Sequence, residues 1–339
     1  IIRLLRFVCV PWYCLRGVMI LILPVLRIGD RVARYPFVQG GMAVRVSTGR
    51  LAAAVAAAGG VGTIAGTGMS CDELRSEIRY ARSQTDGIIG VNVLFAIREF
   101  AVLVHTAIEE KVDFIVSGAG FSRDMFRWGK ESGTNIISIV SSGRLAAAAT
   151  RLGAAAIVAE GGEAGGHLGT FRPLKEVFQE VREATDLPVI AAGGIVTGEE
   201  AAEYFRLGAD GVQLGTRFVA SDECAAADTF KKAHLNVKEE DIIIIQSPVG
   251  MPGRVIRNRF TDSLQGVEPH ERLNCQGCLK HCSRQYCILE ELALAQQGDI
   301  ENGVLFTGTG AMRISEIKPA AEIVSELVEG ALKAINNPG

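Results

Sequence analysis

The sequence predicts an α/β protein built on a closed (β/α)8 barrel, a TIM barrel, with a small, mostly helical cap inserted before the last helix. Three observations lead to this fold. Short apolar runs recur eight times before residue 217, helical stretches alternate with them, and a glycine or polar position follows each run. Alternating strands and helices form parallel sheets, and eight such units suffice to close a barrel. An open doubly wound sheet is the alternative, although such sheets usually have fewer strands.

The apolar runs are rich in Val, Ile and Ala, a composition that suits strands buried on both faces of a parallel sheet. We expect these strands over Phe37–Gln39, Val61–Ala65, Ile88–Leu94, Phe114–Ser117, Ile136–Val140, Ala155–Ala159, Val189–Ala192 and Gly211–Leu214. The intervening stretches have the composition and apolar spacing of helices. We expect these helices over Ser47–Ala58, Asp72–Ser83, Arg98–Lys111, Arg144–Leu152, Leu174–Ala184, Gly198–Leu207 and Glu223–Ala233.

The character of the sequence changes after residue 233, which predicts a second, smaller unit. A β-branched run over Asp241–Ile245, a cysteine cluster and a helical stretch over Cys287–Gln297 fall in this part. The last stretch, Ala320–Ile335, has the apolar spacing of a helix that packs against a barrel wall. The expected division is an extension upstream of Met19 over residues 1–18, the barrel over 19–233, the cap over 234–311 and a returning C-terminal helix over 312–339.

Composition argues against nucleic-acid-binding, membrane-spanning and secreted disulfide-rich proteins. The net charge of −3 and the lack of a long basic run argue against a nucleic-acid partner. No uninterrupted apolar run reaches the roughly 18 residues that a membrane span needs. The scattered cysteines outside residues 275–287 do not suit a secreted disulfide framework. We therefore expect a cytoplasmic enzyme with a small-molecule substrate, and a homodimer is compatible with the sequence.

The loop over residues 160–169 is the strongest candidate for chemistry. It follows an expected strand and contains five glycines, two carboxylates and His167, whose side chain titrates near neutral pH. Glycine weakens helices and strands, so its density here indicates close approach of the backbone to a ligand. His167 is a candidate acid or base, a hydrogen-bond donor to substrate or a structural histidine, and Glu163 can orient it, bind a ligand or remain solvated.

Two further glycine-rich segments follow the seventh and eighth expected strands. They contain Gly193 and Gly194 in the first segment, and Gly215 and Thr216 in the second. Many barrels bind phosphate at this position through backbone N–H groups. The alternative is a pair of turns without a ligand. Gly60-Val-Gly62 is a poor dinucleotide fingerprint, because it precedes its strand and lacks a correctly placed third glycine.

Two amides lie within expected strands, and four cysteines lie within the expected cap. Buried Asn92 and Gln213 need hydrogen-bond partners, which a cofactor ring or a neighbouring loop can supply. The cysteine spacing suits an iron–sulfur cluster or zinc, with unmetallated thiols as the alternative. The expected metal ligands are Cys275, Cys278, Cys282 and Cys287.

Six motifs in order resemble the nitronate monooxygenase family, formerly called 2-nitropropane dioxygenases, which includes FMN-dependent enoyl-ACP reductases of type II. They are Gln39-Gly-Gly-Met42, Val91-Asn-Val-Leu94, Ser117-Gly-Ala-Gly120, Glu163-Ala-Gly-Gly-His-Leu-Gly169, Ala191-Ala-Gly-Gly-Ile195 and Gly208-Ala-Asp-Gly-Val-Gln-Leu-Gly-Thr-Arg-Phe218. The resemblance spans residues 26–335. It implies an FMN-binding barrel with His167 as its active-site histidine. It also implies flavin contacts from Gly40, Gly41, Met42, Asn92, Glu163, Gly166, Gly193, Gly194, Gln213, Gly215 and Thr216.

The resemblance leaves two reactions open. One is oxidation of alkyl nitronates by O2 through the flavin, with His167 as acid or base. The other is reduction of an enoyl-ACP or a related enoyl thioester, with NAD(P)H as co-substrate. The cysteine motif also resembles the iron–sulfur motif of some dienoyl-CoA reductases, although it lies at a different place in the chain. A flavin-binding partner subunit and a metal-dependent aldolase are the other classes of protein considered, and no metal set for an aldolase can be assembled.

Overall fold

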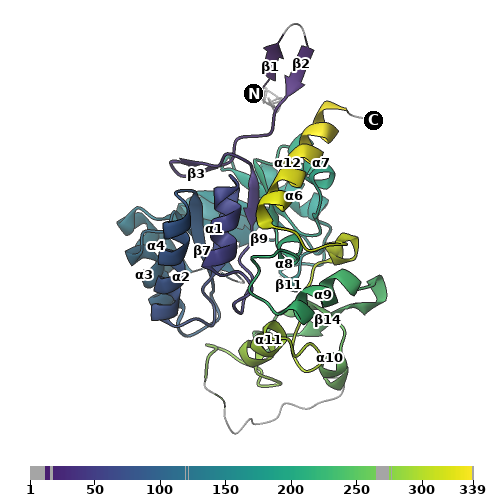
Figure 1. Cartoon of the computed structure of the whole chain (residues 1–339). Helices are drawn as coiled ribbons and strands as arrows, with labels where there is room; N and C mark the ends of the chain where they lie inside the picture. Colours follow the sequence, from purple (N-terminus) through teal and green to yellow (C-terminus); the bar gives the residue numbers. More distant parts are fainter. Residues whose placement is uncertain are drawn as a thin grey trace.

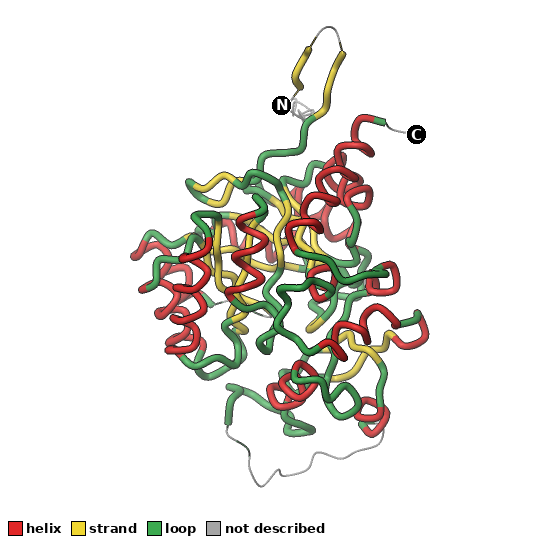
Figure 2. Tube along the Cα trace, in the orientation of Figure 1, coloured by secondary structure: helices red, strands yellow, loops and turns green. Residues whose placement is uncertain are grey.

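The computed structural model describes residues 12–15, 18–118, 120, 122–264, 275 and 277–337, with side chains from residue 22 onward. Its centre is a closed barrel of eight parallel strands, drawn as yellow segments surrounded by red helices in Figure 2. The strands pair in chain order and the last closes on the first. They are β5 (Phe37–Gln39), β6 (Val61–Ala65), β7 (Ile88–Leu94), β8 (Phe114–Gly118), β9 (Asn135–Val140), β10 (Ala156–Glu160), β12 (Val189–Ala192) and β13 (Gly211–Leu214).

All eight predicted strands are confirmed, and none of their ends differs from the prediction by more than one residue. Helices follow the strands and cover the outside of the barrel (Figure 1). They are α1 (Gly49–Ala57), α2 (Cys71–Gln84), α3 (Phe100–Glu109), α4 (Arg123–Ser132), α5 (Gly143–Leu152), α6 (Leu174–Ala184), α7 (Gly198–Arg206) and the short α8 (Thr216–Val219). The α/β barrel expected from the sequence is thereby confirmed.

Two helix predictions need correction. The sequence prediction missed α4, because its segment is polar and has a glycine near the middle, which lowers helix propensity. In the structure Ser122 caps its first turn, Gly133 ends it, and Gly129 allows close packing against Ile136. The helix predicted over Glu223–Ala233 lies instead at α9 (Asp228–Asn236). Glu223 lies before this helix, and its carboxylate accepts a hydrogen bond from the backbone N–H of Ala320, the first residue of the last helix.

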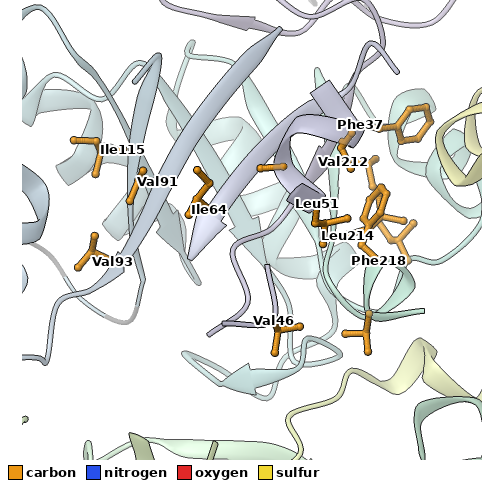
Figure 3. Close-up of a cluster of buried hydrophobic side chains, with 14 of the residues drawn as sticks. Phe37, Val46, Leu51, Ile64, Val91, Val93, Ile115, Val212, Leu214 and Phe218 are labelled. Atoms are coloured by element: carbon orange, nitrogen blue, oxygen red, sulfur yellow. The ribbon is translucent and has the colours of Figure 1, made fainter. Parts of the chain in front are cut away.

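The core has two layers. Figure 3 shows the outer layer, in which side chains such as Val91, Ile115 and Leu214 point from the strands toward the helices. The inner layer fills the barrel. It consists of side chains at the alternate strand positions, which point inward, and includes Val116 and Val158. Because full burial of each such side chain contributes roughly 1.5–3 kcal/mol, the barrel forms a rigid frame for the loops at its rim. Rigid strands thus position the residues that follow them.

The segment between α9 and the last helix forms the cap, below the barrel in Figure 1. It contains α10 (Arg259–Ser263), α11 (Ile288–Gln296) and the 3₁₀ helix η1 (Glu239–Asp241), while η2 (Thr309–Arg313) lies at its end. The cap also carries β14 (Ile242–Gln246) and β15 (Pro252–Ile256), which the sequence predicted only in part. These strands form an antiparallel sheet with β11 (Gly166–His167). The cap is therefore hydrogen-bonded to the loop that carries His167.

The first and last described segments lie on the side of the barrel away from the cap (Figure 1). The last helix, α12 (Ala320–Asn336), packs against α7 as the sequence predicted. Near the N-terminus, β1 (Trp12–Leu15) pairs with β2 (Val18–Leu21), and β3 (Arg27–Ile28) pairs with β4 (Arg31–Val32). The first hairpin crosses the predicted boundary at residue 18. Residues 1–11 and 16–17 lie outside the described part, so the extension remains a prediction.

A membrane-spanning helix is not found. Among the described residues, every helix is too short or too polar to cross a bilayer.

Candidate active site

A cavity of about 240 Å³ lies at the rim of the barrel, where the loops after the strands meet the cap. Its wall contains eleven of the twelve residues that the sequence assigned to catalysis or flavin binding. The structure therefore brings together segments that lie as far apart in the chain as residues 40 and 216. These eleven residues are Gly40, Gly41, Met42, Asn92, Gly166, His167, Gly193, Gly194, Gln213, Gly215 and Thr216.

Part of the cavity wall has the properties of a phosphate cradle. Gly193 and Gly194 both have positive φ, +124° and +74°, which turn the backbone after β12 toward the cavity. In the described part of the chain, the amide N–H groups of Gly194, Gly215 and Thr216 donate to no protein acceptor. Arg313 fixes this loop from outside, because its guanidinium donates to the Gly194 carbonyl oxygen at 2.6 Å. Unpaired N–H groups on a fixed loop suit a phosphate.

Another part of the wall presents the side-chain amides of Asn92 and Gln213, which can serve as hydrogen-bond partners of a polar ring. Asn92 donates to the Gly41 carbonyl oxygen at 3.3 Å, and a Cβ atom on Gly41 would lie only 2.5 Å from the Asn92 Cβ. Ser47 accepts a hydrogen bond from the Met42 backbone at 2.8 Å and holds that loop in place. Gln213 lines the wall beside Gly40. The residues present therefore fit a phosphorylated cofactor with a planar polar ring.

Three contacts hold His167 in place. Its strand β11 pairs with β15, its Nε2 atom lies 2.8 Å from the Ser247 Oγ atom, and its ring packs edge-on against Phe306 with 5.0 Å between centroids. Burial lowers the pKa of His167 to about 4. The ring is therefore neutral at physiological pH and can accept a proton. Ser247 and Phe306 were not identified from the sequence, because they meet His167 only through the cap sheet.

Glu160, at the end of β10, is a second titratable group in the cavity wall. The sequence places it in the glycine-rich loop but assigns it no role. In the described part of the chain its carboxyl group has no hydrogen-bond partner, and burial raises its pKa to about 8. Its raised pKa favours the neutral carboxyl form of Glu160 at pH 7, on the wall of the same cavity as His167.

The raised pKa of Glu160 predicts how stability depends on pH. Between the ordinary value of 4.5 and about 8, the folded protein keeps a proton that the unfolded chain has lost. The free energy of unfolding therefore falls as pH rises through this range, by at most about 1.4 kcal/mol per unit. We expect Glu160→Gln to stabilise the protein by a few kcal/mol at pH 8 and by little at pH 5. Urea unfolding at both pH values measures this, and equal effects at the two would contradict it.

Glu163 is the one predicted flavin contact that the cavity wall does not include. Both of its carboxylate oxygens accept the Leu174 N–H, at 2.9 and 3.1 Å, so the side chain turns away to cap α6. Arg254 supports the same loop by donating to the backbone carbonyl oxygens of Gly162 and Ala164. A flavin contact from Glu163 therefore stays a prediction, and sequence alone does not show in which direction a loop side chain points.

The four predicted metal ligands are free thiols. Cys275 and Cys282 are exposed, Cys278 and Cys287 are partly buried, and burial raises the pKa of Cys278 to about 11. Within the described ranges, no three His, Cys, Asp or Glu side chains are arranged to hold a metal ion. The iron–sulfur or zinc site therefore stays a prediction. The cysteine loop docks on the barrel, where Leu279 pairs with Ile97 and Lys280 lies 3.9 Å from the Phe95 ring centroid.

The cap supplies an apolar wall that the sequence analysis did not identify. Helix α11 contributes three side chains to it, α9 contributes Phe230, and the cap segment before the last helix contributes the others. The wall lies across the same cavity as the glycine cradle and His167, so it suits the hydrocarbon part of a substrate. Its residues are Phe230, Ile288, Leu289, Leu292, Val304 and Phe306.

Known proteins share this architecture. Among curated sequences, the probable nitronate monooxygenase of Staphylococcus aureus (strain MSSA476) is 29% identical over 345 residues, covering 87% of this chain and 93% of its own. Among solved structures, FabK from Thermotoga maritima has a TM-score of 0.82 and 36% identity, covering 89% of this chain and 94% of its own. The nitroalkane oxidase from Streptomyces ansochromogenes has a TM-score of 0.77 and 27% identity, covering 89% and 97%.

A family model described as nitronate monooxygenase matches residues 28–101 and 96–330. This match spans the barrel, the cap and most of the last helix, and it contains every residue of the cavity wall. The chain therefore belongs to the nitronate monooxygenase family of flavoprotein oxidoreductases.

Proposed function

We propose that the protein is an FMN-dependent oxidoreductase that oxidises alkyl nitronates with O2, and that His167 acts as its acid or base. The observation that carries this proposal is a neutral, partly buried His167 on a cavity that also has a glycine phosphate cradle. FMN, when bound, would accept two electrons from the substrate and pass electrons to O2. The protein would bind the phosphate through the amides of Gly194, Gly215 and Thr216, and the ring beside Asn92 and Gln213.

The substrate would lie between the flavin ring and the apolar wall. At pH 7 the His167 ring is neutral, so one of its nitrogens has a free lone pair. That nitrogen can take the proton from the carbon next to a nitro group, which gives the nitronate. The hydrocarbon part would contact Ile288 and Leu292 of α11. Protonated Glu160 would add a hydrogen-bond donor on the same wall without introducing a negative charge.

The test is a spectroscopic one. We expect the purified protein to bind one FMN, and an alkyl nitronate to bleach the flavin absorbance without O2. Admission of O2 should restore it with turnover of the nitronate. Protein that binds no flavin, or flavin that no nitronate reduces or reoxidises, would contradict the proposal.

A second candidate reaction is reduction of an enoyl thioester with NAD(P)H. Two observations favour it: the apolar wall suits an acyl chain, and the 36% identity to FabK, an enoyl-ACP reductase II, exceeds the 27% identity to the nitroalkane oxidase. Anaerobic flavin reduction and turnover assays on the same protein sample distinguish the two reactions. NAD(P)H would reduce the flavin anaerobically, and an enoyl thioester rather than a nitronate would support turnover.

A further inference from the structure

The loop after β12 separates the active-site cavity from a second cavity. Val196 lines both of them, and the second cavity, of about 420 Å³, has α7 and α12 in its wall. Arg313 lines the second cavity but not the first. Its guanidinium donates to the Gly194 carbonyl oxygen at 2.6 Å. That carbonyl group therefore points to the Arg313 side of the loop.

The backbone N–H of Ile195 belongs to the same peptide group as this carbonyl. A trans peptide is planar, and its N–H points opposite to its C=O. The peptide between Gly194 and Ile195 is trans, so the N–H points away from Arg313 and toward the active-site cavity, whose wall includes Ile195. Ile195 is 6% exposed, and among the described residues its N–H has no protein acceptor. Because buried backbone N–H groups are almost always paired, this one indicates an acceptor on a ligand.

Glu200 holds Arg313 in this position. One carboxylate oxygen of Glu200 lies 2.9 Å from the Arg313 Nε atom. The other accepts the N–H groups of Val196 and Thr197, at 2.7 and 3.2 Å, so the cap of α7 satisfies both of them. The N–H of Ile195, one position earlier, is left for the cavity. A charged donor on the carbonyl oxygen also polarises the peptide, which strengthens the N–H on its other side.

We infer that Arg313 is a positioning residue that aims the Ile195 N–H at the phosphate of the cofactor. Ile195 thereby adds one donor to the three N–H groups of the cradle. Within the described ranges, the wall of the active-site cavity contains no lysine or arginine. The phosphate would therefore be held by N–H groups, whose direction decides the affinity. The inference rests on the proposed function for FMN as the ligand, and Arg313 itself touches neither phosphate nor substrate.

A comparison of FMN with riboflavin isolates the phosphate, because riboflavin has the same ring system without it. We expect Arg313→Met to weaken FMN binding by about tenfold or more and riboflavin binding by less than about threefold. Arg313→Lys keeps the charge but loses the planar fork that reaches Glu200 and the Gly194 carbonyl oxygen together, so it should restore only part of the FMN affinity. Titration of flavin-free protein, followed by flavin fluorescence, measures both affinities.

Arg206→Met is the matched control. Arg206 is exposed on α7 and also donates to a backbone carbonyl oxygen of another element, that of Ala334, at 2.5 Å. It lines neither cavity, so its loss should leave both affinities unchanged. Equal losses of FMN and riboflavin affinity in Arg313→Met would indicate a general structural role. That result, or an unchanged FMN affinity, would overturn the inference.

The Ile195 amide provides a direct readout. In protein labelled with ¹⁵N-isoleucine, its signal is assigned by its loss in Ile195→Val. The amide proton should move downfield when FMN binds but not when riboflavin binds, and an equal shift with both, or no shift, would contradict the inference.

Inorganic phosphate separates this inference from the proposed function. If the parent protein binds no flavin, the proposed function fails, but the phosphate donors can still be tested. Phosphate should then raise the midpoint of thermal unfolding of the parent protein more than that of Arg313→Met. An equal rise in the two proteins, or no rise in the parent, would overturn the inference.

Discussion

His167→Gln is expected to lower the rate of flavin reduction by a neutral nitroalkane by about two to four orders of magnitude, the usual contribution of a general base. Glutamine keeps a polar group near Ser247 but cannot accept a proton at neutral pH. The effect is large because, among the described residues of the cavity wall, His167 is the one side chain placed to act as the base. Glu160 already carries a proton, since burial raises its pKa to about 8.

Stopped-flow measurement of flavin bleaching without O2 isolates this step from later turnover. His105→Gln is the matched control, because His105 is exposed on α3, packs against Trp128 and lies outside the cavity wall. Flavin content should equal that of the parent protein in both variants. A His167→Gln rate within a factor of about three of the parent rate would remove His167 from the proton-transfer step.

Gly194→Ala is expected to weaken FMN binding by tenfold or more, which corresponds to at least about 1.4 kcal/mol. At φ +74° a residue with a Cβ atom is strained, by roughly 1–2 kcal/mol. The added Cβ would also lie 2.9 Å from the Glu163 Cβ. Glu163 cannot move away freely, because its carboxylate caps α6 through the Leu174 N–H. The loop must shift instead, and with it the unpaired N–H group that would hold phosphate.

Gly133→Ala separates backbone strain from the effect on the cradle. Gly133 ends α4 at φ +76°, nearly the same conformation, and an added Cβ there would have no atom within 4 Å. We expect Gly133→Ala to lose about 1 kcal/mol of stability with unchanged FMN affinity. FMN titration followed by flavin fluorescence, together with urea unfolding, measures both quantities. Equal FMN affinities in Gly194→Ala and Gly133→Ala would show that the Gly194 loop does not hold the phosphate.

The barrel and most of the cavity wall were predictable from sequence for a specific physical reason. In a parallel barrel every strand ends at the same rim, so residues directly after the strands share one surface. Gly40, Gly194 and Thr216 follow strands, Asn92 lies near the end of one, and all four could be assigned to that rim without coordinates. Helix α4 was missed although Ser122 and Gly133 are local signals of its two ends, because its polar composition and Gly129 lower its helix propensity.

The sequence alone determined the eight strands, the position of His167 at their rim and the glycine cradle, because these follow from local periodicity and from the geometry of parallel strands. Tertiary structure decided which way Glu163 points and that the cysteine loop docks on the barrel. It also joined His167 to Ser247, eighty positions away in the chain, through the cap sheet. Side-chain direction and long-range pairing depend on how separate elements pack, and a pattern of neighbouring residues does not encode them.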